Sequence, residues 1–139
     1  MRTVNLTGAA AAAVFGGIPS TVHAVATGRD PREALRAAGT LVPGRRDRPS
    51  LIAGTAVHAC VSAVWDAVLS GLDHRRRLGV RGGAIAGGVI AVVDLELIGR
   101  AYPEIRALPR IPQWLDHLVF GAIVGASIRQ PTRRPRGGG

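Results

Sequence analysis

The sequence predicts an all-α protein, a four-helix transmembrane bundle with glycine- and alanine-rich helix contacts. Four apolar stretches, at about residues 4–27, 50–71, 79–99 and 112–128, approach the roughly 20 residues that a helix needs to cross a membrane. The chain holds 19 glycines but only two Trp, one Tyr and two Phe, so a water-soluble core would bury little apolar area. The arginines gather between these stretches. We therefore expect a single integral membrane domain over residues 1–128.

The first stretch, residues 4–27, carries a signal for a break in its helix. Pro19 lacks a backbone N–H, its ring collides with the preceding turn, and two glycines at 16–17 lie just before it. We expect a kink or a division into two helices. A cleaved signal peptide is the alternative, because a charged start, an apolar centre and the small residues at 24–26 follow that pattern. The polar residues and the length of the stretch favour a retained helix.

The polar connection after the first crossing contains the start of a further helix. In Asp30-Pro31-Arg32-Glu33, aspartate stands at the N-cap position, proline at the first helical position and glutamate at the third. The residues at 34–41 then give the helix one apolar side. This pattern predicts a short helix that lies in the membrane interface.

The remaining stretches alternate with basic connections. A turn at residues 75–81 separates 50–71 from 79–99, and a basic tail at 129–139, which we expect to be disordered, follows 112–128. Four crossings place both termini on one side of the membrane. The short, arginine-rich turn and tail favour the cytoplasmic side. The sequence thus predicts a multi-pass protein of the bacterial inner (plasma) membrane.

The charge of the chain indicates its partners. All 18 basic residues are arginine and the net charge is +9; with so much Ala, Gly and Val, this composition points to a GC-rich bacterial genome. Nucleic acid is disfavoured because the arginines form no basic helix face and few aromatic side chains are present to stack on bases. We expect a lipid bilayer with anionic head groups as the partner. The single Cys60 excludes an internal disulfide.

Small residues form a stripe on each predicted helix when residues are placed at about 100° intervals. Gly83 and Gly87 make a GxxxG pair on the third helix, and Gly121 and Gly125 make one on the fourth. Such pairs let two helix backbones approach closely in a membrane. A second small-residue face would allow a homo-oligomer or a complex with another membrane protein.

One titratable residue falls on this stripe in each helix: His23, His58, Asp94 and His117. Threading the helices up and down places all four roughly 5–12 Å inside the same membrane surface. This polar intramembrane cluster either stabilises the packing of the helices through interhelical hydrogen bonds or forms a proton- or ion-handling site. The same four residues are candidate ligands for a metal ion such as zinc, and two histidines would suit haem, but without a closely spaced ligand pair no cofactor is predicted.

Other charged residues suggest structural ion pairs. Asp66, near the opposite membrane surface, is within reach of Arg81 at the start of the third helix, so we expect these two to pair. Glu96 and Asp116 lie near the interface, where arginines of the connection between the third and fourth helices are available to them. Asp116 points away from the small-residue stripe of its own helix.

Enzyme motifs are missing from the sequence, which has no Gly-rich phosphate loop, no Gly-x-Ser-x-Gly and no His-Glu-x-x-His. The sequence therefore favours a non-enzymatic accessory or scaffold protein. The alternative is a small transporter or proton/ion-handling unit that uses the His/Asp cluster. The absence of an internal repeat and the presence of only four helices favour the first hypothesis.

Three segments carry a resemblance to known families: residues 19–31, 37–41 (AAGTL) and 114–121 (WLDHLVFG). They resemble a family of uncharacterised small actinobacterial membrane proteins with four helices. The last segment is also similar to the final helix of YagU-type inner-membrane proteins. The resemblance implies an integral membrane protein and no particular activity.

Overall fold

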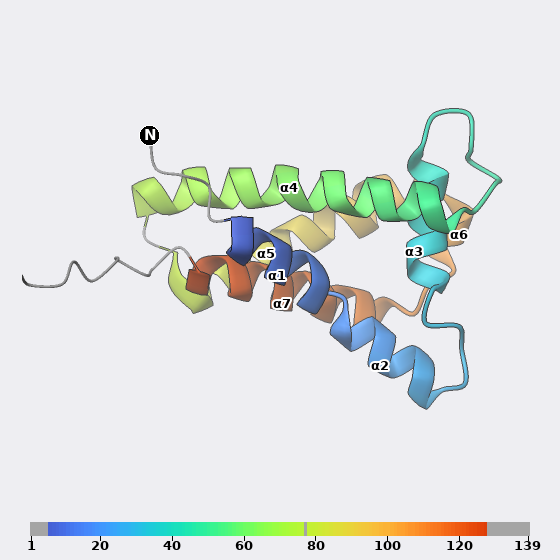
Figure 1. The fold of residues 1–139 in the computed structure, drawn as a ribbon, viewed down its shortest axis with the longest axis horizontal. Helices are drawn as coiled ribbons and strands as arrows, with labels where there is room; N and C mark the ends of the chain where they lie inside the picture. The colour runs from blue at the N-terminus through green and yellow to red at the C-terminus, as the bar shows by residue number, and fades with distance from the viewer. Residues whose placement is uncertain (1–5, 77, 128–139) are drawn as a thin grey trace, which may run out of the picture.

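A computed structural model of the chain describes residues 6–76 and 78–127, and within these ranges every regular element is helical and no strand occurs (Figure 1). The all-α expectation is confirmed. The elements in chain order are α1 (Leu6–Phe15), α2 (Ile18–Ala26), α3 (Glu33–Ala38), η1 (Gly39–Leu41), α4 (Leu51–Arg76), α5 (Gly79–Ala91), η2 (Val92–Ile98), η3 (Gly99–Ala101), α6 (Pro103–Arg106) and α7 (Arg110–Ser127). The predicted tail at 129–139 lies outside the described residues.

The expected break in the first stretch is present. α1 ends at Phe15 and α2 begins at Ile18, with Pro19 in its first turn and Gly17 as the residue before the helix. The break leaves the first N–H groups of α2 without partners inside their own helix. A cap from elsewhere in the fold is therefore needed at this point.

The short helix predicted after the first apolar stretch begins at Glu33, later than the sequence pattern suggested. The backbone N–H of Arg32 donates to the Asp30 carboxylate at 2.8 Å, which forms a turn instead of a helix cap. α3 then runs across one end of the long helices (Figure 1). A Cβ atom built on Gly54 of α4 would overlap the carbonyl oxygen of Leu35, so the two backbones touch.

The third predicted helix changes its winding near its end. After α5, the segment η2 is a π-helix, in which the N–H of Gly99 donates to the carbonyl of Asp94, five residues earlier. The neighbouring carbonyl of Leu95 accepts a hydrogen bond from the Arg110 guanidinium at 3.1 Å. Arg110, at the start of α7, thus supplies a hydrogen-bond donor to a backbone carbonyl of the π-helical segment.

α5 and α7 pack along a seam of glycines, which makes the most extensive contact between any two described elements. A Cβ atom built on Gly83 would overlap the carbonyl oxygen of Gly121, and one built on Gly87 would overlap that of His117. At the other end, a Cβ on Gly125 would overlap the carbonyl oxygen of Gly79. The two predicted GxxxG pairs therefore do face each other, on antiparallel helices.

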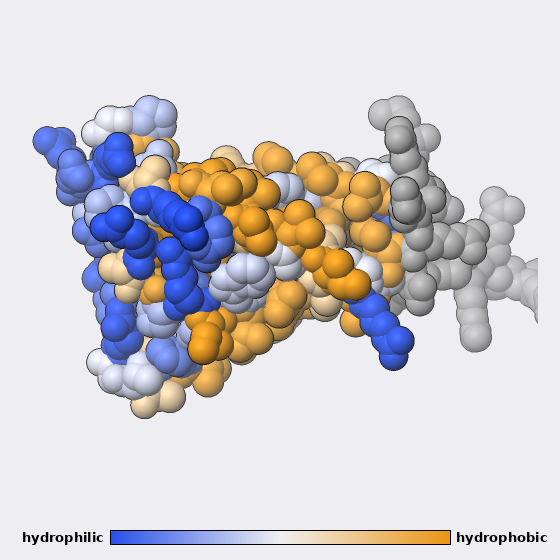
Figure 2. Space-filling view, turned by 180° about the vertical axis from the view of Figure 1, so that it is seen from behind, coloured by the Kyte–Doolittle hydropathy of each residue, from blue (hydrophilic) through white to orange (hydrophobic). Residues whose placement is uncertain are grey.

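The face shown in Figure 2 is mostly apolar along its length, and hydrophilic residues gather at one end of it. Large apolar side chains lie open on the surface, among them Ile52 at 86 %, Ile85 at 71 % and Ile111 at 75 % exposure. Two helical spans in the described residues, Leu51–Asp73 and Gly79–Ala101, are long and apolar enough to cross a membrane.

Candidate functional site

Asp94 and His117, two of the four predicted site residues, lie together. Nε2 of His117 on α7 is 3.4 Å from Oδ2 of Asp94 on η2. The two side chains are 19 % and 20 % exposed, so both are largely covered by protein. Gly87 lies about two helical turns before Asp94. It permits this approach because its lack of a Cβ lets the α7 backbone at His117 pack against α5.

Trp65 of α4 completes the site. Its indole N–H donates to the same Oδ2 atom of Asp94 at 3.0 Å. The site therefore joins three separate helical elements through one carboxylate oxygen. Trp65 lies seven residues after His58, about two turns along the same face of α4, but this spacing does not identify its indole N–H as the partner of an acid in another helix.

The orientation of the His117 ring is fixed from within α7. Nδ1 lies 2.8 Å from the backbone carbonyl oxygen of Gln113, one turn earlier. A carbonyl oxygen only accepts hydrogen bonds, so Nδ1 carries a hydrogen and donates it. Nε2 is thereby directed at Asp94, which is the arrangement in which a histidine exchanges its second proton with a carboxylate.

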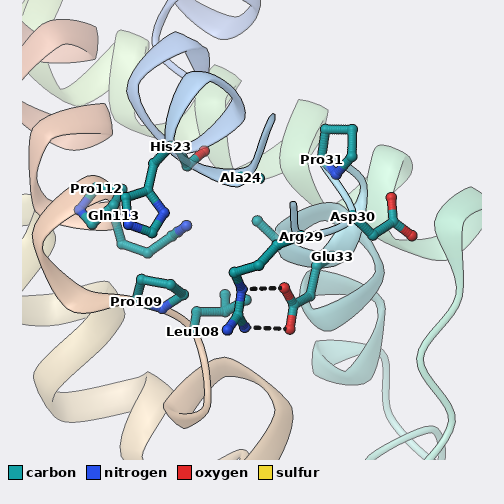
Figure 3. A pocket seen from close by; sticks show the side chains of 12 residues that line it. His23, Ala24, Arg29, Asp30, Pro31, Glu33, Leu108, Pro109, Pro112 and Gln113 are labelled. Carbon is teal, nitrogen blue, oxygen red and sulfur yellow. Dashed lines mark hydrogen bonds and ion pairs between the residues drawn. The ribbon is translucent and has the colours of Figure 1, made fainter. Parts of the chain in front are cut away.

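His58 and His23 are held elsewhere. Nε2 of His58 lies 2.9 Å from the carbonyl oxygen of Ala13, so this ring joins α4 to α1. His23 lines a pocket of about 20 Å³ at the polar end of the molecule, with its ring beside Gln113 (Figure 3). A volume of this size holds about one water molecule. The structure thus brings together two of the four predicted residues and gives the other two separate contacts.

The polar end next to that pocket is closed by ion pairs. Arg29 and Glu33 meet through two hydrogen bonds, at 2.8 and 3.1 Å, which Figure 3 shows. Arg36 pairs with Asp30 at 2.7 Å. These pairs are partly exposed, so each adds little to stability, and both join the connection after α2 to residues of α3.

Asp116 has a role that the sequence did not reveal. Its Oδ1 atom accepts the backbone N–H of Ser20 at 2.9 Å. Ser20 lies in the first turn of α2, directly after the break, where backbone N–H groups lack partners within the helix. A carboxylate from α7 therefore caps a helix to which it is not joined in sequence. The sequence signal that could have indicated this role is the break itself, since the first backbone N–H groups of a new helix need acceptors from outside that helix.

The other acidic residues follow the expectations in part. Glu96 pairs with Arg100 at 3.1 Å and with Arg110 at 3.7 Å, as predicted for an acid beside the connection. Asp66 is 6 % exposed, whereas Arg81 is exposed at the surface. The ion pairs formed between described side chains do not include a pair of Asp66 with Arg81.

Within residues 6–76 and 78–127, no three His, Cys, Asp or Glu side chains lie close enough together to hold a metal ion. The site contains one histidine, one carboxylate and one indole, and an indole nitrogen is a hydrogen-bond donor rather than a metal ligand. The contacts that it makes are the Trp65–Asp94 hydrogen bond and the His117–Asp94 pair.

Comparison with known proteins gives no relatives: no family model, no curated protein and no solved structure matches the chain.

Proposed function

We propose that the chain is a multi-pass protein of the bacterial inner membrane, a four-helix transmembrane bundle with a non-enzymatic accessory or scaffold role. The observation that carries this proposal is the apolar face shown in Figure 2, together with the large apolar side chains that are exposed on α1, α2, α4, α5 and α7. A water-soluble protein rarely exposes a contiguous apolar patch of more than a few hundred Å². In a bilayer, the same side chains lie against acyl chains and need no further covering.

The packing inside the bundle supports the same conclusion. The described core is made of small clusters, such as Ala12, Leu69, Ile90, Phe120 and Val124, instead of one large aromatic interior. The closest contacts are between glycine backbones on α5 and α7. Helix association through small residues is typical of membranes, where burial of apolar area does not drive helix packing because the surrounding lipid tails are equally apolar.

The four crossings would be formed by α1 with α2, by α4, by α5 with η2 and η3, and by α7. The spans Leu51–Asp73 and Gly79–Ala101 support the second and third crossings directly. The shorter apolar segment Ala10–Ala26 supports the first, with the Asp116 cap at its break. α7 has 18 residues and contacts all the others, so it is the central member of the bundle.

The polar end would lie at the level of the lipid head groups. Arg46 is exposed there, donates a hydrogen bond to the carbonyl of Ala101 and stacks 5.5 Å from the ring centre of Tyr102. Arginine beside tyrosine at a membrane surface suits anionic head groups. Further exposed arginines at the connections on this end are Arg32, Arg36, Arg45, Arg48, Arg100 and Arg106.

Thiol labelling tests the membrane location. Cys60, the only cysteine, is exposed on α4 within the span Leu51–Asp73, so lipid should shield it from a charged maleimide until the membrane is dissolved in detergent. The matched control is Arg46→Cys in a Cys60→Ser background, which should react in intact membranes. If the N-terminus is cytoplasmic, this residue reacts in spheroplasts from outside. Release of the protein by alkaline carbonate, or equal labelling at both positions, would refute the membrane location.

A flux assay distinguishes the accessory role from transport. Proteoliposomes with a pH-sensitive dye inside should lose an imposed proton gradient no faster than empty liposomes. His117→Leu and His58→Leu should leave this slow loss unchanged. A rapid loss with the wild-type chain that His117→Leu abolishes would overturn the accessory role in favour of proton transport.

A further inference from the structure

We propose that Asp94 and His117 form a proton-binding site, in which one shared proton fastens α7 to the π-helical segment η2 and, through Trp65, to α4. This goes beyond the accessory role. It rests on the geometry of the three side chains, and it stands or falls separately from the membrane location.

The proton count follows from the hydrogen-bond partners of the His117 ring. Nδ1 donates its hydrogen to the Gln113 carbonyl, which leaves Nε2 as the only ring atom facing Asp94. With no hydrogen on Nε2 or on Oδ2, two lone pairs would face each other at 3.4 Å. One further proton turns this repulsion into attraction, either as imidazolium with carboxylate or as neutral imidazole with carboxylic acid.

Trp65 selects between the two forms. Its indole N–H, which can only donate, points at the same Oδ2 atom that faces Nε2. An oxygen that accepts from two N–H donors is best supplied by an ionised carboxylate. The proton therefore resides on Nε2 of His117, and the pair as a whole is neutral. Loss of that proton leaves a neutral ring whose Nε2 lone pair faces a negative oxygen.

Other charged groups around the pair are already engaged. Asp116, next to His117 on α7, is held by the Ser20 N–H, and Glu96 on η2 is held by Arg100 and Arg110. His58 on α4 is bonded to a backbone carbonyl of α1. Among the ion pairs between described side chains, Asp94 has His117 as its cation and no arginine. The protonated ring is therefore the group that neutralises this carboxylate.

The position of Trp65 makes the site measurable. α4 contacts α5 over a small area compared with the α5–α7 seam, so the Trp65–Asp94 hydrogen bond is a main polar link from α4 to this pair. Besides Trp65 the chain contains only Trp114. An imidazolium next to an indole quenches its fluorescence, so a change of protonation at His117 should change the emission of Trp65.

The experiment uses Trp114→Phe, in which Trp65 is the only tryptophan, purified in detergent and titrated between about pH 4 and pH 10. We expect one titration step in the Trp65 emission and loss of that step in His117→Gln. In Asp94→Asn the ring can still titrate but has no anionic partner, so the midpoint of the step should be displaced. His58→Gln, which alters a histidine on α4 itself, should retain the step. Absence of a step in the parent, or the same step in His117→Gln, would refute the proposal.

A second measurement does not depend on the stability of any variant. In the wild-type chain with ¹⁵N-labelled histidine, one imidazole should retain the proton on Nδ1 across the titration and change state only at Nε2. If every neutral histidine ring carried its hydrogen on Nε2 and none carried it on Nδ1, the hydrogen positions assigned to His117 above would be wrong. Far-ultraviolet circular dichroism of each variant checks that the helices remain folded.

Discussion

Replacement of Gly87 by alanine would place a methyl group on the glycine seam between α5 and α7. The new Cβ atom would overlap the carbonyl oxygen of His117 and lie 2.9 Å from its carbonyl carbon and 3.2 Å from Cα of Leu118. All three are backbone atoms of a helix, so none can rotate away. The neighbouring Gly88 is the matched control, because a Cβ there would meet only the flexible Cδ2 of Leu118 at 3.5 Å.

The magnitude follows from these distances. Carbon atoms prefer separations of about 3.5–4.0 Å, so the backbones at Gly87 must move apart by roughly 0.6–1.1 Å. A gap of about 0.5–1 Å forfeits a quarter to a half of each dispersion contact along the seam. We expect Gly87→Ala to be less stable than Gly88→Ala by about 1–3 kcal/mol. The gain in helix propensity from alanine, about 0.5–1 kcal/mol, is common to both variants and cancels in the comparison.

The assay is reversible unfolding of each variant in mixed micelles by a rising fraction of sodium dodecyl sulfate, followed by circular dichroism. Gly87→Ala should also shift the Trp65 emission, since the substitution displaces α7 at His117, whereas Gly88→Ala should not. Equal unfolding free energies for the two variants would show that the α5–α7 backbones do not touch at this point.

Three further predictions concern backbone groups and close contacts. Asp116→Leu removes the acceptor of the Ser20 N–H and should lower the unfolding free energy by about 1–3 kcal/mol and speed hydrogen exchange at that amide. Arg110→Gln should cost about 0.5–1.5 kcal/mol and weaken the end of η2, because the carbonyl of Leu95 loses its donor. Gly54→Val should detach α3 from α4, measured as faster proteolysis of the connection after α2.

Each of these predictions has a control. Asp116→Asn keeps an oxygen at the Oδ1 position and should recover much of the loss. Arg110→Lys keeps the positive charge but loses the planar guanidinium donor. If it lowers the unfolding free energy as much as Arg110→Gln does, the hydrogen bond to Leu95 contributes more than the ion pair with Glu96. Gly71→Val on the same helix as Gly54 has no atom within 4 Å of its Cβ position and should leave proteolysis unchanged.

Part of this structure was predictable because it depends on local spacing. The break before Pro19 follows from the missing N–H of proline, and the seam at Gly83 and Gly121 follows from residues four apart on one face of a helix. Glu96 was correctly placed near the arginines of the connection. In each case the relevant neighbours are close in sequence or share one periodicity.

The rest depended on contacts between distant elements. The π-helical turn at Val92–Ile98 was not predicted, and the carbonyl of Leu95 within it accepts a hydrogen bond from Arg110, a residue of another element. Asp116 was expected to pair with an arginine. Instead, the side of α7 that carries Asp116 faces α2, and the carboxylate accepts the N–H of Ser20. The partnership of Trp65 with Asp94 likewise depends on how α4 is placed beside η2.

The polar contacts of α7 also bear on the order in which the chain is made. α7 emerges from the ribosome after every group that its side chains require: Ser20 for Asp116, Asp94 for His117, and the glycines of α5 for its own glycines. In the membrane arrangement proposed above, a segment with an aspartate and a histidine in its middle is a poor candidate for entering lipid alone. Because its partners precede it in the chain, α7 can pack against helices that already present these acceptors and donors. A chain truncated before Arg110 would leave the Ser20 N–H, Asp94 and the α5 glycines without their α7 contacts.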